Sequence, residues 1–392
     1  MALALVPMTI VGVLSATTPE TTDYLCFWAG PHLILTDGDP YSQADWNSVT
    51  AGEWVDALGR FRTSNCSDRF AYPYPLTTAV AMLPFGALPL RVGAPLWELT
   101  IFISAGVGLM LLARAAELDR ARALWLALLV ISSEMFYGNA LNAQFGGLIL
   151  LALGLLVAAP RLGPARTTAG VALAALKPHI ITPVPIVRLR AMDRSAVVSA
   201  VALGLLWFAA SLALRPAWIA GWAADLAHRR DMFSASVSLW TLERTLNAPG
   251  LALALIVPTA ALLALTCWRA WPLRAIESTA IVAVAWQLVV PYGLSYDQLG
   301  AIAVAVTAVL CTTVGRPRAW SLLIPLVAVV TILPWFLFSQ GKEMIGARAG
   351  ELEILNAIVP VAICVLLAVA ILTSPRPVST REAVPTRSVS RR

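Results

Sequence analysis

Apolar runs of about the length that crosses a bilayer recur along the whole chain. A transmembrane helix needs about 20 mainly apolar residues, and a series of segments approaches this pattern, with polar residues between them. They cover residues 1–16, 76–90, 92–113, 122–138, 144–159, 167–187, 195–214, 250–268, 276–294, 298–314, 319–338 and 353–372. Only 13% of the residues are charged, against about a quarter in soluble proteins. The sequence therefore predicts an all-α, polytopic membrane protein with about 10–12 membrane segments, and it excludes a soluble enzyme and a nucleic-acid-binding protein.

Two long polar stretches, residues 17–75 and 215–249, interrupt the apolar pattern. Residues 20–70 carry eight acidic side chains against three arginines. In contrast, the short loops near residues 114–122 and 188–194 are rich in arginine. Because arginine and lysine concentrate in cytoplasmic loops, we expect both long stretches to lie outside the cell membrane.

The composition of both ends of the chain also predicts their structure. Residues 1–16 lack the basic start and the cleavage pattern of a signal peptide, so we interpret them as an uncleaved first membrane helix. Residues 375–392 carry five arginines and are predicted to form a basic, disordered cytoplasmic tail. Residues 1–374 then form a single membrane domain, with a large outer loop after the first helix.

Two apolar segments contain prolines that break a helix. Residues 76–90 are interrupted by Pro84 and Pro89, and residues 167–187 are interrupted after Lys177. If all arginine-rich loops face the cytoplasm, two segments must enter and leave by the same face, and these are the best candidates. Irregular backbone at membrane depth is tolerated only where protein or water covers it. The second break therefore predicts a buried polar cavity.

Cysteines and cofactor motifs limit the chemistry. Cys26 and Cys66 both fall in the first outer stretch, where the compartment permits oxidation. They either form a disulfide or are two unrelated buried thiols. No spacing of cysteine and histidine resembles a zinc site, and no glycine-rich phosphate-binding motif is present. We therefore expect no metal, no cofactor and no nucleotide hydrolysis.

Asp23 is a carboxylate that could carry chemistry, because it lies shortly beyond the first apolar segment, at the water interface. A carboxylate held at the membrane interface beside aromatic rings has its pKa raised by desolvation. It can then act as a general base toward a hydroxyl group. The alternative interpretation is a solvated interfacial aspartate or a helix cap. From these residues alone, the alternative is favoured.

A series of short motifs follows one another along residues 20–310. The motifs are Asp23-Tyr24, Gly38-Asp39-Pro40-Tyr41, Tyr72-Pro73-Tyr74-Pro75, Asn142-Ala143-Gln144-Phe145-Gly146, Leu176-Lys177-Pro178, Ser236-Val237-Ser238 with Arg244, and Pro291-Tyr292-Gly293-Leu294-Ser295-Tyr296-Asp297. Their order and spacing resemble glycosyltransferase family 87, a group of polytopic bacterial transferases of the GT-C superfamily. The chain differs from the family's common pattern at Tyr72–Pro75, around Asn142 and Gln144, and at Ser295–Gln298. These differences leave the sugar and the acceptor open.

The resemblance implies an inverting membrane hexosyltransferase. Such an enzyme transfers a sugar, with mannose the first expectation, from a polyprenyl-phosphate-linked donor to a lipid or glycan acceptor. It acts at the outer face of the plasma membrane, as a multi-pass protein, and takes part in building glycolipids of the cell envelope. It requires neither a sugar-nucleotide-binding motif nor a nucleic acid. The oligomeric state stays open.

The resemblance also assigns candidate site residues. Asp23 matches the family's base, and the remaining motifs contribute Gln144, Tyr296, Asp297 and Tyr41 to substrate binding.

Cations are needed for the departing phosphate. Lys177 is the strongest candidate, because an intramembrane lysine is costly and marks a functional site by default, and His179 lies two residues on. Lys177 could instead pair with an intramembrane acid, such as Glu134, for structural reasons. If its segment is based on the inner face, it would not reach an outer site directly.

Arginines of the second outer stretch offer a shorter route to the phosphate. Arg229, Arg230 and Arg244 lie there. The alternative is that they snorkel at the interface in the ordinary way.

Two other functions are compatible with a polytopic chain. A transporter or flippase for a lipid-linked sugar usually has internal repeats with paired broken helices, and no repeat is visible here. An inactive scaffold subunit is the third possibility, against which the presence of Asp23 argues mildly.

Overall fold

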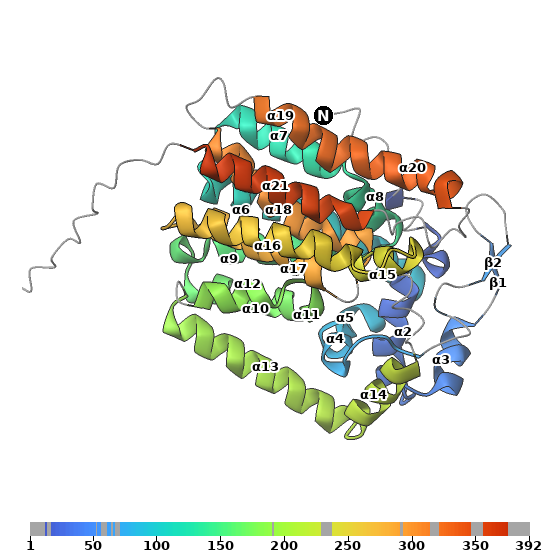
Figure 1. Cartoon of the computed structure of the whole chain (residues 1–392). Coiled ribbons are helices and arrows are strands. Elements are labelled where there is room, and N and C mark those ends of the chain that lie inside the picture. The colour runs from blue at the N-terminus through green and yellow to red at the C-terminus, as the bar shows by residue number, and fades with distance from the viewer. Residues whose placement is uncertain are drawn as a thin grey trace, which may run out of the picture.

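The computed structural model describes a helical membrane protein (Figure 1). It describes residues 12–13, 17–51, 53–55, 61–63, 66, 71–189, 192–228, 237–290, 293–313, 321–345 and 356–374. Apart from residues 12–13, the predicted first helix lies outside these ranges. The predicted tail, residues 375–392, also lies outside them.

Short elements make up the described part of residues 17–75 and the broken segment after it. They are η1 (Pro19–Thr21), α2 (Tyr24–Leu35), α3 (Gln43–Thr50), β1 (Glu53–Val55), β2 (Phe61–Thr63), α4 (Leu76–Ala81) and α5 (Leu83–Gly86). The strands β1 and β2 pair antiparallel, with Trp54 opposite Arg62. A disulfide joins Cys26 to Cys66, which decides between the two interpretations of these cysteines. In Figure 1, α2, α3 and the two strands lie at the right, near the right-hand ends of the long helices, and α4 and α5 lie next to α2.

The next helices form one half of the bundle. They are α6 (Leu90–Ala115), α7 (Arg120–Ile131), α8 (Glu134–Leu141), α9 (Gly146–Val157), η2 (Ala159–Arg161), α10 (Pro164–Ala175), α11 (Pro178–Ile181), α12 (Pro183–Arg188), α13 (Arg194–Leu214) and α14 (Trp218–His228). The predicted break after Lys177 is confirmed, because α10 ends at Ala175 and α11 begins at Pro178. A second break precedes Pro183.

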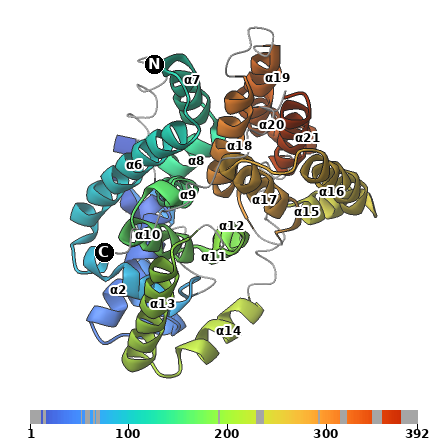
Figure 2. The ribbon, with the colours of Figure 1, turned by 90° about the vertical axis from the view of Figure 1, so that its left-hand side faces the viewer.

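The second half of the bundle follows. It contains α15 (Leu239–Thr245), α16 (Leu251–Arg269), α17 (Ala275–Val289), η5 (Ser295–Gln298), α18 (Leu299–Thr312), α19 (Leu323–Val327), the π-helical η7 (Ala328–Ile332), α20 (Leu333–Ile345) and α21 (Val359–Leu372). Figure 2 views the helices closer to end-on and shows these elements beside the first half.

Small residues let central helices approach closely. A Cβ atom added at Gly108 of α6 would lie 2.7 Å from the backbone of Leu150 in α9, and one added at Gly147 would lie 2.2 Å from the carbonyl oxygen of Ile101. Such contacts are typical of helix pairs in membranes, where packing replaces the hydrophobic effect. Helix α18 packs against α7, α9, α17 and α21, and all of its residues are buried. It forms the centre of the bundle.

The predicted fold class is confirmed. Four helices in the described ranges are long and apolar enough to cross a membrane, or five if the bent pair α7 and α8 counts as one span. The four are Leu90–Ala115, Arg194–Leu214, Leu251–Arg269 and Ser295–Thr312. Shorter apolar helices occupy most of the other predicted segments.

Candidate active site

Asp23 lies directly ahead of α2 but does not cap it. Its side chain makes no capping hydrogen bond. Instead, its Oδ2 atom accepts hydrogen bonds from the Gln144 amide and from the Tyr296 hydroxyl group, the latter at 3.4 Å. The Oδ1 atom has no hydrogen-bonding partner among the described residues. Asp23 is half-buried, so it is neither a helix cap nor a freely solvated interfacial carboxylate.

A chain of polar contacts leads from Asp23 into the bundle. The Lys177 ammonium donates to the Gln144 amide oxygen at 3.1 Å and to Oδ1 of Asp297 at 2.5 Å. The Lys177 Nζ atom also lies 5.3 Å from the centre of the Tyr296 ring, within the range of a cation–π contact. Gln144, Lys177, Tyr296 and Asp297 are all less than 10% exposed. We call these four residues, together with Asp23, the Asp23 cluster.

Irregular backbone between helices positions the side chains of Lys177 and Gln144 in the Asp23 cluster. Lys177 has a non-helical backbone between α10 and α11, as expected for a residue that precedes proline. Gln144 follows Ala143, which has a left-handed φ of 52° and whose carbonyl accepts a hydrogen bond from the Trp97 indole at 2.7 Å. A non-glycine residue in this region costs roughly 1 kcal/mol or more. This turn therefore directs the Gln144 side chain toward Asp23.

A second set of contacts fixes η5, which carries Tyr296 and Asp297. The Asn139 amide donates to the Tyr296 carbonyl at 2.7 Å, and its oxygen accepts from the Gly146 backbone N–H at 2.8 Å. The Ser295 hydroxyl group donates to Glu134 at 3.0 Å. Sequence reasoning missed Asn139. The only feature of the sequence that pointed to Asn139 was its position directly after the apolar segment of residues 122–138.

The alternative in which Lys177 pairs with a buried acid is confirmed, but the acid is Asp297. It is not Glu134, which accepts hydrogen bonds from Ser295 and Asn356. Lys177 reaches Asp23 through Gln144, which hydrogen-bonds to both residues.

Burial raises the pKa of the Asp23 carboxyl group above its usual value near 3.8. The hydrogen bond from Gln144, the charge of Lys177 and the hydrogen bond from Tyr296 lower it, and the charge of Asp297 raises it again. Desolvation disfavours a charged carboxylate and is the largest of these effects. A carboxyl group in this setting is a better proton acceptor than a solvated one.

The remaining predicted residues lie outside this hydrogen-bonded chain. The Tyr41 hydroxyl group donates to the Tyr74 carbonyl at 2.7 Å, in an aromatic group that reaches Phe27 and Phe145. His179 is half-buried on α11, and its carbonyl accepts from the Trp286 indole. Arg244 is exposed on α15 and donates to Thr241. Arg229 and Arg230 lie outside the described residues.

Comparison with known proteins gives one match. A sequence model of glycosyltransferase family 87 matches residues 72–294. The chain belongs to glycosyltransferase family 87. No curated protein and no solved structure gave a significant match. Gln144 and Lys177 lie inside the matched range. Tyr296 and Asp297 lie just beyond its end, and Asp23 lies well ahead of its start.

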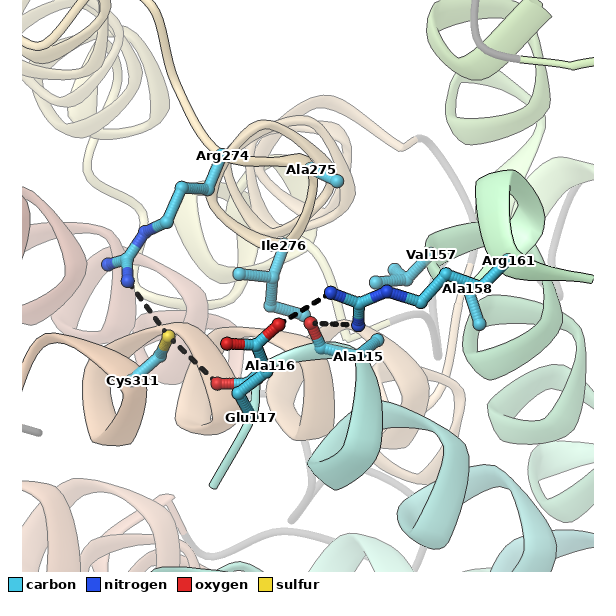
Figure 3. Close-up of a pocket in the computed structure, with 10 residues that line it drawn as sticks. All are labelled: Ala115, Ala116, Glu117, Val157, Ala158, Arg161, Arg274, Ala275, Ile276 and Cys311. Carbon is cyan, nitrogen blue, oxygen red and sulfur yellow. Dashed lines mark hydrogen bonds and ion pairs between the residues drawn. The ribbon is translucent and has the colours of Figure 1, made fainter. Parts of the chain in front are cut away.

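The family 87 chain has a cavity at the other end of the bundle. Its volume is about 340 Å³, and its lining includes Glu117, Arg161, Arg274 and Cys311 (Figure 3). Helix α9 begins beside the Asp23 cluster and ends at Val157 on this cavity, so the two sites are about 16 Å apart along it. In the described ranges, no group of three or more His, Cys, Asp or Glu side chains could hold a metal ion.

Proposed function

We propose that this glycosyltransferase moves a hexose, in the first instance mannose, from a polyprenyl-phosphate donor to a lipid or glycan acceptor. The observation that carries the proposal is the Asp23 carboxyl group, which is half-buried, held through one oxygen and unbonded at the other. The family gives the reaction class. A donor dissolved in the membrane suits a chain of apolar helices that lacks a sugar-nucleotide-binding motif. Nothing in the described residues favours a carrier.

The proposed reaction is a single displacement. Oδ1 of Asp23 takes the proton of the acceptor hydroxyl group as its oxygen forms a bond to the anomeric carbon of the donor. The bond from that carbon to the phosphate oxygen breaks, and the polyprenyl phosphate leaves with the electron pair. One direct displacement inverts the anomeric configuration. A positioned base contributes about 10²–10⁴-fold to such a step.

The leaving phosphate needs a cationic surrounding. The charge of Lys177 is matched by that of Asp297, so we assign the phosphate to Arg244 as the cation and to His179 as a hydrogen-bond donor. Arg244 is exposed on α15, and the start of this helix is tied to the segment ahead of η5 by a hydrogen bond of 2.6 Å from Val237 N–H to the Gly293 carbonyl. His179 follows the break next to Lys177. We place this reaction at the outer face of the plasma membrane, where the acidic stretch of residues 20–70 is expected.

The test is a transfer assay with the purified full chain. Polyprenyl-phosphate-mannose, polyprenyl-phosphate-glucose and GDP-mannose are each incubated with a membrane lipid extract, and labelled products are separated and their anomeric configuration determined. We expect transfer from a polyprenyl-phosphate sugar, with inversion, that is lost in Asp23→Asn. Transfer from GDP-mannose alone, or retention of configuration, would contradict the proposal.

A further inference from the structure

The two contacts of the Gln144 side chain determine which way its amide group faces. A lysine ammonium has three hydrogen-bond donors and no acceptor. The atom that faces Lys177 is therefore the amide oxygen, and the NH2 group is left to face Asp23. If Lys177 were absent, the amide could rotate by 180° and accept a hydrogen bond from a protonated Asp23. Lys177 thus disfavours the orientation in which Gln144 binds the neutral form of Asp23, and so favours the charged form.

Lys177 is itself held in place. Its ammonium forms an ion pair with Asp297, and both side chains are 5% exposed. The second carboxylate oxygen of Asp297 accepts a hydrogen bond from the Leu294 backbone N–H at 3.0 Å. Buried ion pairs retain their geometry when the remaining oxygen atoms are also bonded. The position of the Lys177 ammonium is therefore fixed by a partner other than Gln144.

We propose that Lys177 and Asp297 are positioning residues that act on Asp23 through Gln144. The ion pair fixes the Gln144 amide, and Gln144 with Tyr296 holds Oδ2, so that Oδ1 faces the acceptor hydroxyl group. This inference rests on the proposed function, in which Asp23 is the base. It gives Lys177 a role other than binding the donor phosphate.

The charges that face Asp23 have opposite signs, and this makes the proposal testable. Lys177 favours the ionised carboxylate, and Asp297 disfavours it. Tyr296 and Gln144 contribute hydrogen bonds that favour the ionised form. Removal of the lysine charge should move the acid limb of the pH–rate profile to higher pH. Removal of the Asp297 charge should move it to lower pH.

The experiment measures kcat and donor KM against pH with polyprenyl-phosphate-mannose and a fixed amount of membrane lipid extract. The variants are Gln144→Met, Lys177→Met, Asp297→Asn and the double variant Lys177→Met/Asp297→Asn. Glu117→Gln, which removes an exposed charge at the far end of α6, is the matched control. Size-exclusion chromatography and thermal unfolding establish which variants are folded. The double variant removes both charges together and so avoids an unpaired buried charge.

We expect Gln144→Met to lower kcat about ten- to hundredfold, as for one lost hydrogen bond to a charged group, and to move the acid limb to higher pH. Lys177→Met should also move the acid limb to higher pH, and Asp297→Asn should move it to lower pH. The double variant and Glu117→Gln should leave the acid limb nearly unchanged. The donor KM should change little in all of them.

Two results would overturn the inference. One is an acid limb that stays in place in every folded variant while Asp23→Asn is inactive, which would leave the proposed function intact. The other is a rise in donor KM in Lys177→Met with unchanged kcat and acid limb, which would assign Lys177 to the donor phosphate. If Asp23→Asn itself keeps wild-type turnover, the proposed base is wrong, and this outcome is distinct from both.

Discussion

The two ends of the bundle use the same kinds of side chains in opposite ways. In the Asp23 cluster, the ion pair between Lys177 and Asp297 has both side chains 5% exposed. At the cavity end, Arg161 and Glu117 pair with their side chains 57% and 77% exposed. Water screens the second pair, whereas the first stands in a low-dielectric surrounding. The pair between Lys177 and Asp297 can therefore influence the charge of a neighbouring carboxyl group more strongly than the pair between Arg161 and Glu117 can.

Labelling provides an all-or-none test of which end faces outward. Cysteine substitutions at Ser48 in α3 and at Glu117 after α6 place a thiol at each end, and both positions are exposed. We expect an impermeant thiol reagent to modify Ser48→Cys in intact cells and to modify Glu117→Cys only after the cells are opened. The parent chain gives the background from Cys267. Labelling of Glu117→Cys alone in intact cells would reverse the orientation and move the proposed site to the cytoplasm.

Asp23→Asn should have the largest effect on turnover. The amide keeps the size of the side chain but cannot accept the proton, so the rate should fall about 10²–10⁴-fold, or roughly 3–5 kcal/mol in activation free energy. Donor binding should change little, because the base faces the acceptor. Steady-state transfer and donor titration measure both quantities.

Asp37→Asn and Asp39→Asn are the matched controls for this prediction. Both residues lie in the turn after α2, where Asp39 accepts a hydrogen bond from the Tyr41 backbone N–H. They should retain activity. Full turnover in Asp23→Asn, combined with loss of turnover in one of these two, would move the base into that turn.

The two ion pairs should differ in their contribution to stability. Breaking a buried pair by removing one partner costs about 3–5 kcal/mol, so Lys177→Met should lower the free energy of unfolding by that amount. Arg161→Gln removes one partner of an exposed pair and should cost about 1 kcal/mol or less. Chemical denaturation in detergent micelles compares the two. Equal losses of unfolding free energy in the two variants would contradict the prediction that the buried pair contributes more than the exposed pair.

The smallest predicted effect is on pH dependence. Because burial raises the pKa of Asp23 above about 3.8, the acid limb of kcat/KM should lie above the range of an ordinary aspartate. The folded chain holds this proton more tightly than the unfolded chain. The contribution of Asp23 to stability is therefore full below pH 3.8 and decreases as the pH rises through the folded pKa. In Asp23→Asn, both the acid limb of kcat/KM and this decrease in stability with rising pH should be absent.

The sequence predicted the elements well and the contacts between them less well. Prolines and apolar length are local signals, so the break after Lys177 and most helix positions were predicted within a few residues. The motifs that contain Asp23, Gln144, Lys177 and Tyr296 were also singled out. The partner of Lys177 was not predicted, because Glu134 and Asp297 are equally plausible acids until the rotation of each helix is known. Asn139 was missed for the same reason, since its contact with Tyr296 joins residues 157 positions apart.

The disulfide between Cys26 and Cys66 makes the assembly of this enzyme depend on the compartment into which its first loop is delivered. The bond joins the helix that follows the proposed base to a residue 40 positions further along the chain, and such bonds persist only under oxidising conditions. A chain whose first loop stays in a reducing cytosol would carry two thiols instead. A host for heterologous production therefore has to supply suitable export and oxidation pathways as well as suitable membrane lipids. Only then can an inactive preparation be attributed to the wrong sugar or the wrong acceptor.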